Sequence, residues 1–190
     1  MHKMRTQQLT AIPDRGVTVW ITGLPAAGKT TIALAVQDAI HHSGRLASVI
    51  DGDELRKGLC SDLGFTPEDR TENVRRAAEM AAYLARQGII TLVALISPML
   101  HQRSSARVLH DAHGIPFVEV WVSTPIEVCR ERDPKGLYGR YLQGSLHGLT
   151  GIDDPYEPPE SPDLILPTES ISIDDSVESV MAILTKLGIL

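Results

Sequence analysis

The chain has 190 residues, of which 43% are hydrophobic and 22% are charged, a composition typical of one globular domain with its own core. Its formal net charge of −6 argues against a general nucleic-acid-binding protein, which would present a basic face. No apolar run approaches the roughly 20 residues that span a bilayer. The N-terminal residues lack the apolar stretch of a signal peptide, and Cys60 and Cys129 have no metal-ligand spacing. We therefore expect a cytoplasmic protein that binds neither nucleic acid nor a membrane.

Strand and helix patterns alternate along the chain, which predicts a parallel sheet covered by helices on both faces. In chain order, we expect strand 17–22, helix 29–42, strand 46–50, helix 54–59, helix 71–86, strand 89–96, helix 100–112, strand 117–122, a helix from about residue 125 to 132, strand 164–166 and helix 176–186.

Two segments lie outside this alternation. Residues 1–16 are polar and are expected to form an N-terminal arm, so that the main domain covers residues 17–190. Segment 133–162 is rich in Gly, Pro, Tyr and Asp and has weak periodicity. Loops of this length inside a compact domain are usually functional or disordered. Because the segment carries Lys135 and Arg140, we interpret it as an active-site lid rather than a linker.

A phosphate-binding motif, G-x-x-x-x-G-K-T, runs from Gly23 to Thr30 between the first strand and the first helix. Glycines let backbone N–H groups converge on phosphate oxygens, and the new helix points its positive end at the same anion. Lys29 would reach the β- and γ-phosphates of ATP, and the Thr30 hydroxyl would bind Mg²⁺. A chance match would lack the flanking strand and helix. The expected ATP-binding residues here are Gly23, Leu24, Pro25, Ala26, Ala27, Gly28, Lys29, Thr30 and Thr31.

The motif and the alternation together predict an α/β fold of the P-loop nucleotide-kinase type, with a five-stranded parallel sheet. The second strand ends in two acids, Asp51 and Asp53, at the edge of the sheet where ligands bind in such folds. A carboxylate there can hold Mg²⁺ through water or accept a proton from an attacking hydroxyl. The alternative to such a role is that both acids are solvated residues of a surface loop. The pattern does not separate the two acids. We take Asp53 as the first choice, with Thr30, as a metal-linked residue and Asp51 as the second.

Basic side chains gather after the second strand and again near the predicted lid. Arg56, Arg70 and Asn73 follow the two acids, and Arg70 and Asn73 share one helix face. Arginine pairs bidentately with phosphate or sulfate oxygens, so this group predicts a pocket for an anionic acceptor. The alternative, surface salt bridging, is plausible for the neighbouring Arg75 and Arg76.

The second basic group is Arg130, Arg132, Lys135 and Arg140. Cations over the phosphates neutralise charge in the transition state of phosphoryl transfer, and a closed lid excludes water. We expect Arg130 and Arg132 to contact ATP.

These stretches resemble the adenylyl-sulfate kinase (APS kinase) family over nearly the whole chain from about Gly16. The marks are GLPAAGKT, the DGDELR segment that starts at Asp51, LGFTPEDRTENVRR, the ISP tripeptide, RDPKGLY, and GLTGIDDPYEPP that ends at Pro159. The resemblance implies that ATP phosphorylates the ribose 3′-hydroxyl of adenylyl sulfate, which gives 3′-phosphoadenylyl sulfate and ADP. It also implies Mg²⁺ and a homodimer.

The resemblance further implies roles in binding the acceptor. Asp53, Arg56, Arg70 and Asn73 would bind it, Phe65 would stack on its adenine, Ile96 and Ser97 would line its pocket, and Lys135, Gly148 and Leu149 would close over it. In some bacterial members the residue matching Ser97 is described as phosphorylated. Direct in-line transfer needs no enzyme nucleophile, so we treat Ser97 as a pocket residue.

One position departs from the family pattern. Members commonly have Phe where Leu149 stands, and that ring would form the second face of an adenine sandwich with Phe65. A kinase of the same fold with another nucleotide acceptor is therefore an alternative. A non-catalytic nucleotide-binding regulator is a further alternative. A regulator of this kind would be expected to lack Lys29, the strand-end acids or the lid cations, but all of them are present.

Overall fold

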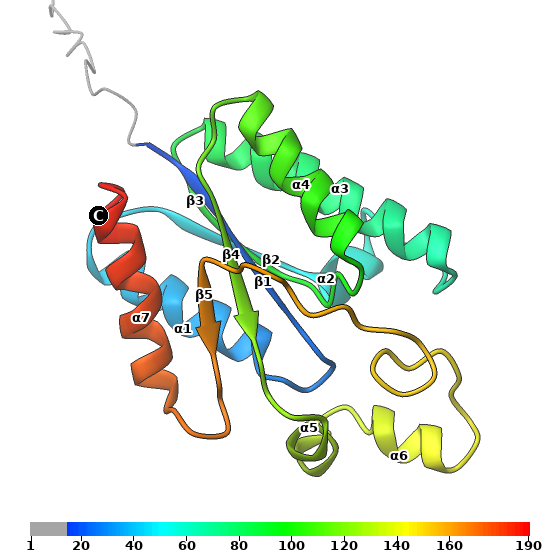
Figure 1. Cartoon of the computed structure of the whole chain (residues 1–190). Helices are drawn as coiled ribbons and strands as arrows, with labels where there is room; N and C mark the ends of the chain where they lie inside the picture. The colour runs from blue at the N-terminus through cyan, green and yellow to red at the C-terminus, as the bar shows by residue number, and fades with distance from the viewer. Residues whose placement is uncertain (1–14) are drawn as a thin grey trace, which may run out of the picture.

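The computed structural model describes residues 15–190, so the predicted arm lies almost wholly outside the described residues. A parallel five-stranded sheet with the order β2-β3-β1-β4-β5 forms the centre of the molecule (Figure 1). Its strands are β1 Val17–Gly23, β2 Ala47–Asp51, β3 Ile90–Ala94, β4 Phe117–Val122 and β5 Leu164–Leu166. The predicted fold class is confirmed.

Helices cover both faces of this sheet. They are α1 Lys29–His42, α2 Gly52–Lys57, α3 Pro67–Arg86, α4 Leu100–Ala112, α5 Ile126–Arg132, α6 Leu137–Leu142 and α7 Ile173–Lys186. α1 and α7 pack together on one face, and α3 and α4 pack together on the other (Figure 1). None of the helices between residues 15 and 190 is long and apolar enough to cross a bilayer.

Alternation along the central strand β1 divides the core into two layers. Val17, Val19 and Ile21 face the layer shared with α1 and α7, whereas Trp20 faces the layer under α3 and α4. All four side chains are fully buried. A strand that is apolar on both faces is what a central parallel strand requires, because helices cover it on both sides. The sheet is therefore a rigid platform whose carboxyl edge holds the loops of the site.

Two helices begin three or four residues earlier than the sequence predicts, and each has a capping residue at its start. α3 begins at Pro67 rather than Thr71, because the Thr66 hydroxyl accepts a hydrogen bond from the Asp69 N–H at 3.2 Å. α7 begins at Ile173 rather than Ser176, because Ser172 and Asp175 form a reciprocal capping box. In both cases the cap lies within a polar run whose composition is typical of a loop.

The segment 133–162 contains a helix that the sequence analysis does not predict. α6 covers Leu137–Leu142, and the hydroxyl of its buried Tyr138 donates to the Pro25 carbonyl oxygen at 3.1 Å. The contact ties α6 to the phosphate-binding loop. A six-residue helix is too short for the 3.6-residue period to show in the sequence.

Candidate active site

One large cleft, with a volume of about 1410 Å³, opens at the carboxyl edge of the sheet. Most of the predicted site residues line it: Pro25, Ala26, Gly28, Lys29, Thr30, Thr31, Asp51, Asp53, Arg56, Phe65, Arg70, Asn73, Ile96, Ser97, Arg132, Lys135, Gly148 and Leu149. The cleft therefore joins the phosphate-binding loop to the predicted acceptor pocket in one continuous space.

The phosphate-binding loop has a backbone that its glycines permit. Gly23 has φ +152°, and a Cβ atom there would lie 2.6 Å from the Val122 carbonyl oxygen. Gly28 has φ +106° and precedes the first turn of α1. Left-handed backbone of this kind strains residues that carry a Cβ atom. Three of the expected ATP-binding residues, Gly23, Leu24 and Ala27, do not line the cleft: Gly23 is the buried last residue of β1, Ala27 is fully buried, and Leu24 packs against the core.

The Lys29 ammonium group folds back onto its own loop. It donates to the carbonyl oxygens of Gly23 at 3.0 Å and Leu24 at 2.8 Å. Burial lowers the pKa of Lys29 from its ordinary value of 10.5 to about 8. An anion bound in the loop would give the ammonium group a direct counter-charge and would raise this pKa again.

This shift predicts that ATP binding takes up a proton at Lys29. Near and above pH 8 part of the lysine is neutral before binding and becomes charged in the complex. ATP affinity should therefore fall as pH rises above 8, by up to about tenfold per pH unit, and should be unaffected by this group below pH 7. Calorimetry in buffers of different ionisation enthalpy measures the uptake. A Lys29→Met variant should take up fewer protons than the wild-type protein when it is saturated with ATP. Equal proton uptake in the two proteins would contradict the assignment.

The structure separates the two strand-end acids. Asp51 ends β2 and accepts a hydrogen bond from the Thr30 hydroxyl at 2.6 Å, and its other oxygen accepts the Asp53 N–H at 2.8 Å at the start of α2. Asp53 is exposed and forms an ion pair with Lys135 from the segment after α5. Of the two acids expected near a metal ion, the geometry places Asp51 rather than Asp53 against Thr30.

Mg²⁺ suits this corner of the cleft. It is usually held by one or two carboxylates together with the phosphates of a nucleotide. Thr30 and Asp51 supply a hydroxyl and a carboxylate beside the phosphate-binding loop. Among residues 15–190 no three His, Cys, Asp or Glu side chains gather as a self-sufficient metal site. The donor set therefore fits an ion that arrives with its nucleotide.

An exposed aromatic ring stands on the opposite side of the cleft. Phe65 is 67% exposed, an unusual state for a phenylalanine, and the Arg56 guanidinium lies 4.3 Å from its ring centre. Arg56 is held in turn by the carbonyl oxygens of Leu63 and Gly64. One face of the ring is therefore covered by a fixed cation, and a planar ligand could stack on the ring.

Arg70 organises the loop that faces this ring. Its guanidinium donates to the Gly148 carbonyl oxygen at 2.6 Å, to the Thr150 hydroxyl at 3.1 Å and to the Phe65 carbonyl oxygen at 3.0 Å, and it pairs with Asp154. Arg70 thus lines the cleft as expected, but its donors are engaged with the protein. Its position fixes Phe65 and the 148–154 loop relative to each other.

Three buried side chains line this half of the cleft. Leu149 is 5% exposed and packs into the core layer of α1 and α7. Ser97 is 2% exposed, and its hydroxyl accepts a hydrogen bond from the Trp20 indole N–H at 3.0 Å. Asn73 is 5% exposed, and its side-chain NH₂ group has no hydrogen-bond partner among the described residues. A buried donor without a partner costs about 1–3 kcal/mol, and a ligand acceptor atom that reached this group would remove that cost.

The two arginines of α5 have different positions. Arg132 lines the cleft and donates to the Thr168 carbonyl oxygen at 2.7 Å and to the Ala27 carbonyl oxygen at 3.3 Å. Arg130 is exposed and does not line the cleft, so the structure brings only one of the two arginines expected to contact ATP into this space. Residues two apart on a helix point about 200° away from each other, so only one of them can face the site.

A further wall of the cleft, beside Arg132, is not predicted from the sequence. Thr168, Ile171, Ser172 and Ile173 line the cleft between β5 and α7. Thr168 also donates to the Ala27 carbonyl oxygen at 3.1 Å. The signal was available, because ligands bind at the carboxyl ends of parallel strands and Thr168 follows β5. The signal is weak, because β5 has only three residues and its loop carries no motif.

A parallel sheet with a phosphate-binding loop, a strand-end acid beside its threonine and a cleft that continues past Arg56 and Arg70 is typical of a P-loop nucleotide-dependent kinase. Comparison with known proteins narrows the class. The family described as adenylylsulphate kinase matches residues 15–167, and the chain belongs to that family.

Individual relatives agree with this assignment. The adenylyl-sulfate kinase of Paraburkholderia xenovorans is 45% identical over 174 residues, which cover 92% of this chain and 96% of that protein. A solved structure of the Mycobacterium tuberculosis APS kinase CysC in complex with AMPPNP and APS has a TM-score of 0.89 and 45% identity, and the match covers 91% and 99% of the two chains. A hexameric APS kinase from Thiobacillus denitrificans has a TM-score of 0.71 and 30% identity over 94% of this chain and 30% of that one.

Proposed function

We propose that the protein transfers the γ-phosphoryl group of ATP to the ribose 3′-hydroxyl of adenylyl sulfate, with 3′-phosphoadenylyl sulfate and ADP as products. The observation that carries the proposal is the continuity of the cleft. Lys29 and Thr30 lie in one half and Phe65 and Asn73 in the other, so a donor phosphate and an acceptor nucleotide can meet without crossing solvent. Family membership agrees with this reaction.

In this proposal ATP occupies the half of the cleft beside α1. Its phosphates lie on the backbone N–H groups at the start of α1, where the helix dipole and Lys29 favour negative charge. The wall formed by Thr168 and Ile171, next to Arg132, is placed to contact the base and ribose. Thr30 and Asp51 would hold Mg²⁺, which neutralises phosphate charge when it is bound.

The acceptor occupies the other half. Its adenine stacks on Phe65, its polar edge meets the unpartnered NH₂ group of Asn73, and its anionic groups lie near Arg56. Asp53, at the start of α2, would accept the proton of the attacking hydroxyl, because it lines the same cleft as Lys29 and Phe65. Asp53 is paired with Lys135, so substrate binding exchanges that ion pair for contacts with substrate.

Segment 133–162 acts as the lid in this proposal. It supplies Lys135, Gly148 and Leu149 to the cleft, and Tyr138 joins it to the phosphate-binding loop. Closure of such a segment excludes water, which favours transfer to the hydroxyl over hydrolysis of ATP.

A coupled assay of ADP release tests the proposed acceptor. Micromolar adenylyl sulfate should support turnover, whereas adenosine 5′-monophosphate, which lacks the sulfate, should be a much poorer acceptor. Equal rates with several nucleotides, or a clear preference for another one, would instead favour the alternative of a different acceptor, which the leucine at position 149 motivates.

Exchange of aromatic and aliphatic side chains tests the two sides of the adenine pocket. Phe65→Leu should raise the KM for adenylyl sulfate roughly tenfold, because base–aromatic stacking contributes about 1–3 kcal/mol. Leu149→Phe should lower this KM but reduce the melting temperature, because the site is buried and overpacking costs about 1–3 kcal/mol. Steady-state kinetics and thermal unfolding measure both effects. An unchanged KM in Phe65→Leu would remove Phe65 from the pocket.

We also propose that the protein forms a homodimer, as the family resemblance implies. Light scattering coupled to gel filtration gives the mass directly. A mass near twice the 20.7 kDa of the chain supports the dimer, whereas a monomer or a hexamer contradicts it.

A further inference from the structure

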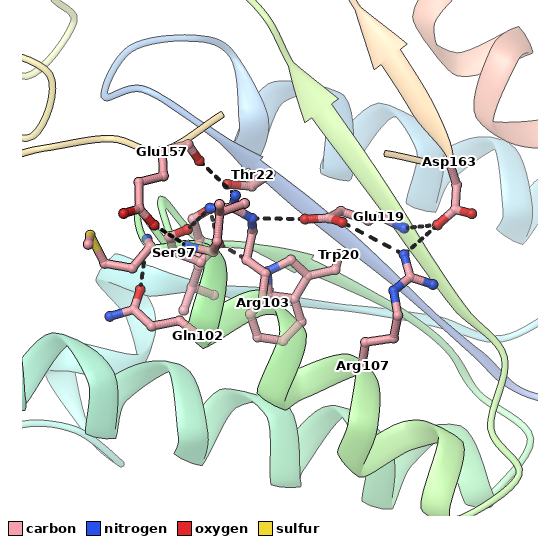
Figure 2. A network of polar contacts seen from close by, with 12 residues as sticks. Trp20, Thr22, Ser97, Gln102, Arg103, Arg107, Glu119, Glu157 and Asp163 are labelled. Carbon is pink, nitrogen blue, oxygen red and sulfur yellow. Dashed lines mark hydrogen bonds and ion pairs between the residues drawn. The ribbon is translucent and has the colours of Figure 1, made fainter. Parts of the chain in front are cut away.

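The turn that forms the floor of the acceptor pocket is strained and is held by three donors (Figure 2). Ser97 has φ +38°, in the left-handed region that a residue with a Cβ atom rarely adopts. The Trp20 indole N–H donates to its hydroxyl at 3.0 Å, and the Thr22 hydroxyl donates to the preceding Ile96 carbonyl oxygen at 2.6 Å. The third donor is Arg103 of α4, which reaches the Ser97 carbonyl oxygen at 2.7 Å. Such backbone persists only where its surroundings over-determine it.

The same guanidinium also holds the returning end of the lid. Arg103 donates to the Glu157 carbonyl oxygen at 2.7 Å. The Glu157 N–H donates to the Pro98 carbonyl oxygen at 2.8 Å, and the Glu157 carboxylate accepts the Leu100 N–H at 2.7 Å (Figure 2). One planar group therefore joins the pocket floor to the lid, two segments about 60 residues apart in the sequence.

Arg103 can do this without entering the cleft. Its side chain is 2% exposed, and its charge is balanced by Glu119 of β4 at 2.8 Å. Arg107, one turn further along α4, lies 3.7 Å from the same Glu119 and pairs with Asp163. Arg107 contacts neither the floor turn nor Glu157 among its described contacts, so it shares the ionic network but lacks the bridge.

We infer that Arg103 is a positioning residue for the acceptor site, because it fixes the Ser97 floor relative to the lid. Arg70 holds the lid at Gly148 and Asp154, and Arg103 holds it three residues further on at Glu157. The lid loop that carries Leu149 is thus tied to α3 at one end and to α4 and the floor turn at the other. The inference rests on the proposed function, since the acceptor is taken to be adenylyl sulfate.

The matched variants Arg103→Lys and Arg107→Lys test the inference by kinetics. Lysine keeps the charge beside Glu119 but cannot reach both carbonyl oxygens with a planar fork. Arg103→Lys should raise the KM for adenylyl sulfate at least tenfold and leave the KM for ATP within twofold. Arg107→Lys should leave the KM for adenylyl sulfate and the KM for ATP within twofold of the wild-type values, even if its melting temperature falls as much as that of Arg103→Lys. Equal kinetic effects of the two variants would overturn the inference.

Trp20→Phe provides a second test of the inference if Arg103→Lys does not fold. It removes the donor to the Ser97 hydroxyl and keeps a ring against Phe117, to which Trp20 is stacked at 5.8 Å. The KM for adenylyl sulfate should rise severalfold with the KM for ATP unchanged. No change in either KM would show that the position of Ser97 does not limit acceptor binding and would overturn the inference.

Hydrogen exchange separates this inference from the proposed function. In Arg103→Lys the Leu100 and Glu157 amides should exchange at least tenfold faster than in the wild-type protein, whereas the amides of the phosphate-binding loop should not change. Arg107→Lys should preserve the protection of both amides. A wild-type protein without turnover of adenylyl sulfate would refute the proposed acceptor, and unchanged exchange in Arg103→Lys would separately refute the bridge.

Discussion

Lys29→Met is expected to lower turnover by at least about 10²–10³-fold, the loss typical when a preorganised charge is removed from a transition state. The ammonium group lies in the phosphate-binding loop, where the transferred phosphoryl group develops charge over its oxygens. The fold should survive. Burial lowers the pKa of Lys29, which means that the folded state disfavours its charged form at neutral pH, and an apolar side chain removes that cost.

The control for this variant is Lys186→Met, at the exposed end of α7 and outside the cleft. Its turnover should match that of the wild-type protein. Steady-state assays and thermal unfolding of both variants give the comparison. A Lys29→Met protein that is unfolded, or one with near-normal turnover, would contradict the role of this lysine.

Asp53→Asn is expected to lower kcat by about 10²–10⁴-fold, because positioned proton acceptors contribute that much to catalysis. Its dependence on Mg²⁺ should be unchanged. Asp51→Asn should do the reverse and raise the Mg²⁺ concentration needed for half-maximal rate, because Asp51 is the acid beside Thr30. Asp51 caps α2, and asparagine is also a good helix cap, so the start of α2 should tolerate Asp51→Asn.

Titration of the rate with Mg²⁺ for both variants distinguishes the two roles. If Asp53→Asn shifted the Mg²⁺ requirement and Asp51→Asn did not, the assignment would have to be exchanged. This test decides a question that the spacing of the two acids left open.

Local patterns predicted the sheet and the phosphate-binding loop, because each depends on residues close together in the chain. The alternation of strands and helices specifies a parallel sheet, and Gly23, Gly28 and Lys29 lie within one motif. The starts of α3 and α7 were misplaced for the same local reason, since Thr66 and Ser172 resemble loop residues until their caps are seen. The direction in which Arg130 points required the phase of α5, which seven residues do not reveal.

Contacts between distant segments could not be predicted in this way. Trp20 and Ser97 are 77 residues apart, and Arg103 and Glu157 are 54 residues apart. Nothing in the sequence near Arg103 distinguishes it from the neighbouring Arg107, yet only Arg103 contacts the floor of the pocket. Family resemblance supplied roles for residues such as Phe65. It did not show that Arg70 binds the lid at Gly148, Thr150 and Asp154.

The position of the transferred phosphoryl group is the most direct test of the proposed reaction. Adenylyl sulfate and Mg·ATP should be incubated with the protein, and the product analysed by ³¹P NMR. We expect one new phosphomonoester, coupled to the ribose H3′ proton and formed in equal amount to ADP. ADP accompanied by inorganic phosphate, or a phosphoryl group on any other oxygen, would contradict the account.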